Sequence, residues 1–148
     1  SLRKAGVLVK GVDDILIKFG KCCQPVPGDP IVGYITRGFG VTVHRTNCVN
    51  ALRMNPERQI EVAWSQEISE TYPVKIRIIS QDRMGLLADL VGNISKLGAN
   101  ILNAKTETRE NKVVDSFFTI GVEDTTHLEK ILAAVKKVKH VQEVKRVG

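Results

Sequence analysis

Residues 72–148 carry the clearest hydrophobic pattern of the chain. Apolar and polar positions alternate from Val74 to Ile78, which predicts a strand with one buried face. Apolar residues then recur at helical spacing as far as Leu97, and Gly98 is well placed to end that helix. The predicted elements are a strand over 74–79, a helix over 86–97, strands over 101–108 and 113–122, a helix over 128–138 and a strand over 141–147. Their order, βαββαβ, predicts a ferredoxin-like fold.

The first half of the chain has shorter apolar runs, which turns rich in glycine and proline separate. Predicted strands lie over 7–9, 15–19, 31–36, 41–44 and 60–64, with a short helix over 47–54 that Pro56 stops. The polar stretch 65–71 is the expected boundary between the two halves. We therefore predict an α+β chain, in which a small β-rich, cysteine-containing domain (1–68) precedes the ferredoxin-like domain (69–148).

Composition narrows the class of protein. The chain has 148 residues, of which 43% are hydrophobic and 26% are charged, as in globular proteins. No apolar run approaches the ~20 residues that span a bilayer, so we exclude a membrane protein, and the absence of a signal peptide favours the cytoplasm. Because the sequence does not begin with methionine, we expect it to be part of a longer protein. The net charge of +6 suits an anionic partner such as RNA, whereas an aromatic content of 5% argues against a surface that stacks many bases.

Four residues of the first half form a candidate Cys₃His zinc site: Cys22, Cys23, His44 and Cys48. Thiolate sulfur and imidazole nitrogen are ligands that zinc prefers, and four of them complete a structural tetrahedron. Adjacent cysteines point to opposite sides of a strand, so both can bind one ion only if they lie in a turn. Two alternatives stay open: the cysteines are small buried hydrophobic residues beside an ordinary histidine, or a cysteine and the histidine form a nucleophile pair.

Longer motifs surround these four residues. The stretch 22–29 reads CCQPVPGD, and it is followed by IVGYI at 31–35, by GFGVTVHR at 38–45 and by Cys48. This arrangement resembles the cysteine-rich "zinc-finger" or RIS domain of the RelA/SpoT homologues, the bacterial (p)ppGpp synthetase/hydrolase enzymes of the stringent response. The stretches DRMGLLAD at 82–89 and GANI at 98–101 resemble the ACT domain of the same proteins. The resemblance extends from about Gly6 to Val147.

The resemblance implies a regulatory region that has no catalytic residues of its own, since the catalytic domains of that family precede it. It implies zinc bound by the cysteine–histidine set, and contact with the ribosome, its RNA and uncharged tRNA. We expect the RNA contacts to be mainly with phosphates, from Lys21, Arg37 and Arg45 near the cysteine cluster.

An amino-acid sensor is the second implication, because ACT domains that resemble this one bind amino acids, often across a dimer interface. A glycine turn into a helix N-terminus offers free N–H groups to a carboxylate, while Asp82 and Asn100 offer acceptors to an ammonium group. The expected ligand is valine or isoleucine, and the expected oligomer is a homodimer through the ACT half. The full set of expected ligand-binding residues is Asp82, Arg83, Met84, Gly85, Leu86, Leu87, Asn100 and Ile101.

Two other functions remain alternatives. The chain could be the ACT-type amino-acid sensor of a different enzyme, although the cysteine-rich half is not a usual companion there. It could also be a zinc-dependent RNA-binding module, which the scarcity of aromatic residues and the dispersed charge weaken.

Overall fold

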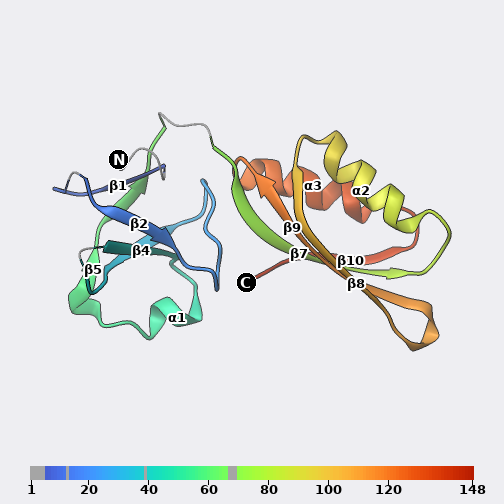
Figure 1. The fold of residues 1–148 in the computed structure, drawn as a ribbon, viewed down its shortest axis with the longest axis horizontal. Coiled ribbons are helices and arrows are strands. Elements are labelled where there is room, and N and C mark those ends of the chain that lie inside the picture. Colours follow the sequence, from blue (N-terminus) through green and yellow to red (C-terminus); the bar gives the residue numbers. More distant parts are fainter. Residues whose placement is uncertain (1–5, 13, 39, 67–69) are drawn as a thin grey trace. The chain divides into compact units, whose positions relative to one another are not determined.

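The computed structural model describes residues 6–12, 14–38, 40–66 and 70–148. Residue 39 of the glycine-containing motif and residues 67–69 of the expected boundary lie outside this part of the chain. The chain divides into two compact units, one of residues Ser1–Glu70 together with Gly148 and one of residues Thr71–Val147 (Figure 1).

The first unit is built mainly from short strands. A four-stranded sheet has the order β2-β4-β3-β5, in which β2 runs parallel to β4 and the other neighbours are antiparallel. A two-stranded sheet pairs β1 with β6. The elements are β1 (Val7–Val9), β2 (Leu16–Phe19), β3 (Ile31–Ile35), β4 (Gly40–Arg45), α1 (Val49–Leu52), the 3₁₀ turn η2 (Pro56–Arg58), β5 (Gln59–Ile60) and β6 (Val62–Trp64).

Strand alternation gives this unit two separate apolar clusters. On β4, Val41 and Val43 pack with Val7 and Val9 of β1 in one cluster. The second cluster joins β3 to α1 and contains Cys23, Tyr34, Cys48 and Ala51, with Cys22, Val32 and Met54 packed against it. Because successive side chains of a strand point to opposite faces, His44 lies on the opposite face of β4 from Val43, on the face of the second cluster.

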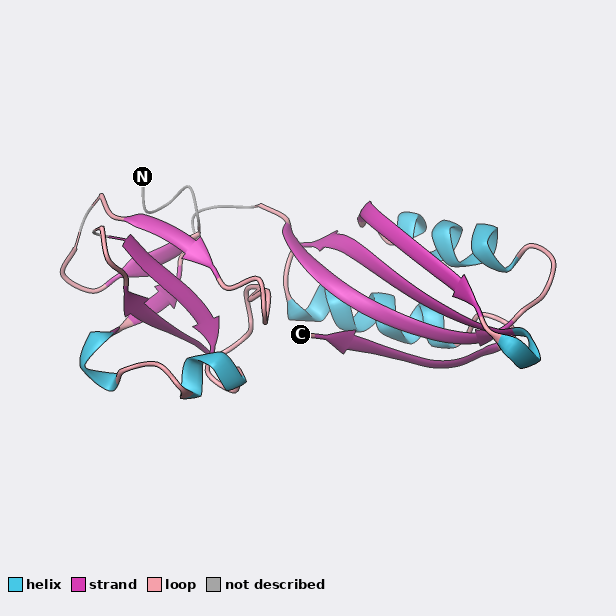
Figure 2. Cartoon of the chain, turned by 60° about the horizontal axis from the view of Figure 1, so that its bottom comes forward, coloured by secondary structure: helices cyan, strands magenta, loops and turns pink. Residues whose placement is uncertain are grey.

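The second unit confirms the predicted βαββαβ order and the ferredoxin-like fold. Its antiparallel sheet has the strand order β10-β7-β9-β8, and both helices cover one face of it (Figure 2). The elements are β7 (Tyr72–Gln81), α2 (Leu86–Lys96), β8 (Asn100–Thr108), the 3₁₀ turn η3 (Glu110–Lys112), β9 (Val113–Val122), α3 (Thr125–Lys136) and β10 (Val141–Val147). Alternate residues of β7 from Tyr72 to Ser80 are buried under the helices, as the period of two requires.

The ends of the two helices have local chemical causes. Gly98, with a φ of +82°, follows the last turn of α2 in the left-handed conformation that glycine adopts readily. The Asp124 side chain caps α3 by accepting a hydrogen bond from the His127 N–H at 2.7 Å.

Two predictions about the first unit need correction. The strand expected over 60–64 is two strands, because β5 pairs with β3 whereas β6 pairs with β1. The helix expected over 47–54 begins only at Val49 and ends at Leu52, since Cys48 has an extended backbone (φ −69°, ψ 129°). Within the described residues, no helix is long and apolar enough to cross a bilayer.

Candidate metal centre

The four predicted ligands come together at one point of the first unit. The donor atoms of Cys22, Cys23, His44 and Cys48 all lie within 4.8 Å of one another. His44 Nδ1 is 3.4 Å from the sulfur of Cys22 and 3.6 Å from that of Cys23. The sulfurs of Cys22 and Cys48 are 3.5 Å apart. The three cysteines are free thiols, and all but Cys22 are buried with the histidine.

A tight turn after β2 allows both adjacent cysteines to face the histidine. The Gly20 N–H donates to the Val43 carbonyl at 2.8 Å, so the start of the turn is held against β4. The Gln24 N–H then donates back to the Gly20 carbonyl at 2.8 Å, and Gln24 has a positive φ of 43°. The turn therefore removes the strand geometry that would have pointed the two thiols apart.

His44 and Cys48 reach the cluster from β4 and α1. Cys48 is the residue that precedes the first turn of α1, and its carbonyl accepts a hydrogen bond from Leu52 N at 3.1 Å. Tyr34 ties these elements together, since its hydroxyl donates to the Ala51 carbonyl at 3.1 Å and its ring stands edge-on to the imidazole of His44.

Gly20 and Tyr34 are site residues that the sequence analysis missed. A Cβ atom on Gly20 would lie 2.5 Å from His44 Nδ1 and 3.3 Å from the sulfur of Cys22, so only glycine leaves room for the imidazole. The backbone of Gly20 has no positive φ, so the reason for glycine is space and not conformation. The one signal in the sequence is a glycine two residues before the cysteine pair, and it does not distinguish this role from an ordinary turn.

Burial and hydrogen bonds together set the pKa values of three of the donors. Burial raises the pKa of the Cys23 thiol to about 12, although the Arg45 N–H, 3.3 Å from that sulfur, acts in the opposite direction. Burial also raises the pKa of Cys48, but the N–H groups of Ala51 and Asn50 at the start of α1, together with neighbouring thiols, bring it below its usual value. Burial lowers the pKa of His44, which keeps the imidazole in the neutral form that binds metals.

Three of the donor–donor distances are close to those around a tetrahedral ion of the size of zinc. Bonds of about 2.3 Å to sulfur and about 2.05 Å to nitrogen at tetrahedral angles place two sulfurs about 3.8 Å apart, and a sulfur and a nitrogen about 3.6 Å apart. The observed 3.5 Å between sulfurs and 3.4 and 3.6 Å between sulfur and nitrogen lie within about 0.3 Å of these values. Four protein donors leave no position for water or substrate, so the arrangement is typical of a structural metal site.

The three basic residues expected near the cluster do not all lie there. Lys21 follows β2, and Arg45 ends β4 at the same end of the sheet. Arg37 was expected with them, and this placement is wrong. The strands β3 and β4 form an antiparallel hairpin in which Ile31 pairs with Arg45, and Arg37 lies beyond the other end of β3, about 20 Å away along the strand.

The predicted amino-acid loop begins α2 in the second unit. Gly85 precedes the helix with a φ of +79° and no side chain caps the first turn. Asp82 and Met84 are exposed, whereas Leu86 belongs to the core. Arg83 fixes the loop to the rest of the unit, because its guanidinium donates hydrogen bonds to the Lys139 carbonyl at 3.1 Å and to the Asp89 carboxylate at 2.7 Å.

Asn100 and the loop do not meet within one chain. Asn100 pairs with Gly121, which pairs with Pro73 at the start of β7, whereas the loop follows Gln81 at the end of β7. The length of β7, about 26 Å from Pro73 to Gln81, separates them. A site that uses both features therefore requires two copies of the chain.

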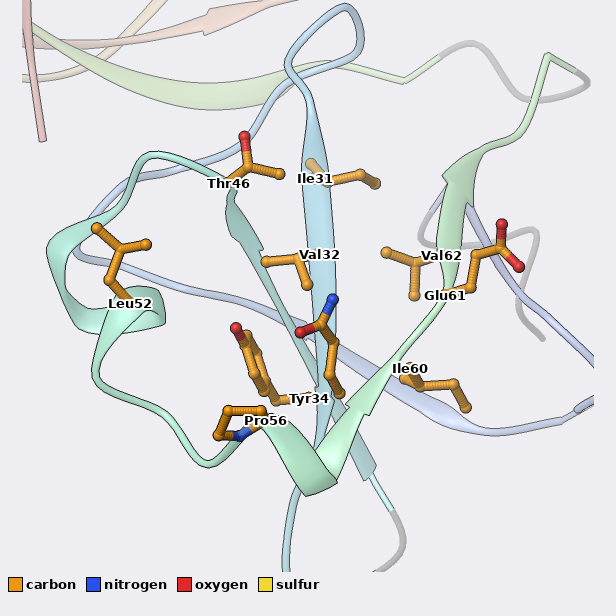
Figure 3. A pocket seen from close by; sticks show the side chains of 10 residues that line it. Ile31, Val32, Tyr34, Thr46, Leu52, Pro56, Ile60, Glu61 and Val62 are labelled. Atoms are coloured by element: carbon orange, nitrogen blue, oxygen red, sulfur yellow. The ribbon is translucent and has the colours of Figure 1, made fainter.

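A cavity of about 530 Å³ opens on the first unit beside β3 and between α1 and β6 (Figure 3). Apolar and polar side chains both line it, and Tyr34 belongs to the cavity as well as to the cysteine cluster. The lining residues are Ile31, Val32, Tyr34, Thr46, Leu52, Pro56, Gln59, Ile60, Glu61 and Val62. None of the site residues selected from the sequence, all of which are in the described part of the chain, lines it.

Comparison with known proteins gives matches to both halves. Residues 7–65 match the RelA/SpoT RIS domain family, and residues 68–146 match the ACT domain family. The chain is 42% identical over 145 residues to a GTP pyrophosphokinase of Myxococcus xanthus. This match covers 97% of the chain and 19% of that protein. It is 44% identical over 144 residues to the bifunctional (p)ppGpp synthase/hydrolase RelA of Mycobacterium tuberculosis, with 96% and 20% covered.

The chain thus spans about a fifth of the length of these curated relatives. Among solved structures, the crystal structure of the ACT domain from the GTP pyrophosphokinase of Chlorobium tepidum is 26% identical, with a TM-score of 0.47, and the match covers 52% of this chain and 99% of that one.

Proposed function

Because this chain belongs to the RelA/SpoT family, as a RIS domain followed by an ACT domain, we propose that it couples ribosome contact and amino-acid sensing to the catalytic domains of a (p)ppGpp synthetase/hydrolase. The observation that carries this proposal is that the two domains follow one another along nearly the whole chain. Relatives named GTP pyrophosphokinase and RelA match this chain over the same length. The region acts in the cytoplasm, where ribosomes are found, and performs no chemistry itself.

Zinc has a structural role in this proposal. Bound by Cys22, Cys23, His44 and Cys48, it joins the turn after β2 to the end of β4 and the start of α1. A small domain with two modest apolar clusters gains much of its stability from such a link.

Dimerisation and amino-acid binding are coupled in our proposal. The edge strand β8 is exposed along almost its whole length, and Leu102 of β8 and Leu87 of α2 expose 58% and 52% of their surface. Antiparallel pairing of β8 with the same strand of a second copy gives the backbone N–H and C=O groups of both edge strands hydrogen-bond partners. In such a pair, the Asn100 end of one β8 lies beside the Thr108 end of the other. Thr108 and Gln81 lie at the same end of the sheet, and the loop 82–87 follows Gln81, so Asn100 of the second copy comes to the end that carries this loop.

The ligand of this two-chain site is a small branched amino acid, valine or isoleucine. Its carboxylate binds the free N–H groups at the start of α2, and its ammonium group binds Asp82 and the Asn100 oxygen of the second copy. Met84 and Leu87, both exposed in one chain, supply apolar contacts, together with Ile101.

Ribosomal RNA is the proposed macromolecular partner of the first unit. Lys21 and Arg45 lie at the end of the sheet that carries the cysteine cluster and make phosphate contacts there.

Arg37 provides a control for this surface, since it carries the same charge at the opposite end of the sheet. Charge reversal by Lys21→Glu with Arg45→Glu should weaken ribosome binding and reduce its salt dependence, whereas Arg37→Glu should change little. Equal effects of both changes would contradict this surface.

The proposed function is tested in the intact enzyme that contains this chain. Ribosomes with uncharged tRNA should change the rates of (p)ppGpp synthesis or hydrolysis in the whole enzyme, and deletion of residues 7–147 should remove this response while basal catalysis persists. If the response survives the deletion, the region does not carry ribosome regulation. If the enzyme has no (p)ppGpp activity and responds only to an amino acid, the alternative of an ACT-type sensor of a different enzyme is correct.

A further inference from the structure

Two neighbouring sulfurs of the cluster differ in their access to solvent. The sulfurs of Cys22 and Cys48 are 3.5 Å apart. Cys22 is partly exposed, whereas Cys48 has 8% of its surface exposed and Cys23 only 1%. An exposed thiol beside a buried one is the arrangement of an oxidisable cysteine and its resolving partner.

We propose that Cys22 is a site of oxidation by peroxides and that it forms a disulfide with Cys48, which expels the metal. The sulfur of Cys22 attacks one peroxide oxygen, the O–O bond breaks, and Cys22 becomes a sulfenic acid while one water (or alcohol, from an alkyl peroxide) leaves. The sulfur of Cys48 then attacks the Cys22 sulfur, the S–OH bond breaks, and a second water leaves as the S–S bond forms. Two thiols are oxidised and one peroxide is reduced.

Cys48 is the resolving residue because the Cys23 sulfur is fully buried and is held by a backbone hydrogen bond. The Cys23 sulfur accepts a hydrogen bond from the Arg45 N–H at 3.3 Å and is packed among Tyr34 and Ala51. A disulfide between the adjacent Cys22 and Cys23 would also close a strained ring within one turn. The link from Cys22 to Cys48 requires only that the sulfurs move about 1.5 Å closer, to the usual bond length of about 2.05 Å.

The disulfide replaces the metal as the connection between the turn after β2 and α1. Once it forms, only Cys23 and His44 remain as donors, which is too few for a structural zinc site. The metal therefore leaves, while the covalent bond keeps α1 attached to the sheet. The release of metal rests on the metal binding proposed above. The disulfide itself requires only the thiols of Cys22 and Cys48.

The test uses the whole chain, with bound zinc measured before any treatment. The folded protein is exposed to graded hydrogen peroxide, remaining thiols are blocked with N-ethylmaleimide, and trypsin then separates Cys48 from the cysteine pair, because cleavage follows Lys21, Arg37 and Arg45. We expect one linked peptide pair, and fragmentation between the adjacent cysteines should place the link on Cys22 and the maleimide on Cys23. Zinc release, followed with a chromogenic chelator, should match the disulfide mole for mole.

Two variants sharpen the assignment. Cys23→Ser should still form the disulfide, whereas Cys48→Ser should stop at a sulfenic acid on Cys22 that dimedone traps. Because the peptide map is made on the unmodified chain, the test does not depend on the folding of either variant. A link to Cys23, a link between chains, or sulfinic acid without any disulfide would overturn the proposal even if zinc is bound. A disulfide at the expected pair in protein without zinc would instead overturn only the metal proposal.

Discussion

Replacing Gly20 with alanine is expected to weaken zinc binding by about 10²–10³-fold without unfolding the chain. The added methyl group would lie 2.5 Å from His44 Nδ1 and 2.6 Å from Cε1, whereas ordinary contacts begin at 3.4 Å. The imidazole must therefore move by about 0.9 Å, which exceeds the tolerance of roughly 0.2 Å for a metal–ligand distance. Gly20→Ala removes His44 from the site although it leaves His44 in the sequence.

The magnitude follows from the loss of one ligand in four. Structural zinc sites bind with about 10–16 kcal/mol at neutral pH, so one ligand accounts for roughly 2.5–4 kcal/mol, or about two to three powers of ten in affinity. Alanine otherwise fits at this position, since the backbone of Gly20 has no positive φ. The fold should therefore survive when zinc is present in excess.

Competition with a chelator of known affinity measures the loss, and the absorption of bound cobalt reports whether a nitrogen ligand remains. Gly92→Ala is the matched control, because a Cβ at that helical position meets no atom within 4 Å. A double-mutant cycle with His44→Ala isolates the mechanism: if Gly20→Ala acts through His44, it should have no further effect in the His44→Ala chain. Unchanged zinc affinity in folded Gly20→Ala, or full additivity in the cycle, would refute the reasoning.

Four further predictions concern protons, ligand, assembly and stability. Because the Cys23 thiol has a pKa of about 12, zinc must displace its proton, so apparent zinc affinity should rise at least about tenfold per pH unit near neutrality, and a flat profile in the same chelator assay would contradict this. Calorimetry should detect valine or isoleucine binding that Asn100→Ala weakens by about 1–3 kcal/mol, and absence of heat at millimolar ligand would remove the sensor function. Sedimentation should show a dimer at tens of micromolar that Leu102→Asp dissociates, and a monomeric wild-type chain would count against pairing through β8. Asp115 is buried and paired with Arg77 at 2.7 Å, and this hydrogen bond is the main cause of its lowered pKa, so Asp115→Ala should lower the free energy of unfolding by about 1–3 kcal/mol at neutral pH. Denaturant titrations should find that this difference is lost only as the pH falls through the lowered pKa. A difference that persists in acid would contradict the ion pair.

The second unit illustrates how much a sequence can predict when each element is long. The alternation along β7 and the helical spacing from Leu86 to Leu97 each specify the element and the face that it buries. Gly98 and the break between the strands predicted over 101–108 and 113–122 mark where elements end, and both lie where the pattern predicts them. These features depend on residues within a few positions of one another, so a reader of the sequence has all the information that determines them.

The amino-acid loop shows where that information ends in the same unit. The residues of the loop and Asn100 were selected together because their chemistry is complementary, yet the length of β7 lies between them in one chain. Nothing in the residue types reveals this separation, because it follows from the order of strands in the sheet.

The βαββαβ order of the second half, the short strands of the first half and the residue types of a metal site can all be predicted from the order of residues alone. The folded structure is needed to see that the run 60–64 divides between two sheets, that Arg37 lies away from the cluster, and that Gly20 and Tyr34 pack against His44. The physical reason is the range of the interactions. Helical and strand periods arise from neighbours in the chain, whereas strand pairing, register and the space around an imidazole are set by contacts between residues that are far apart in sequence.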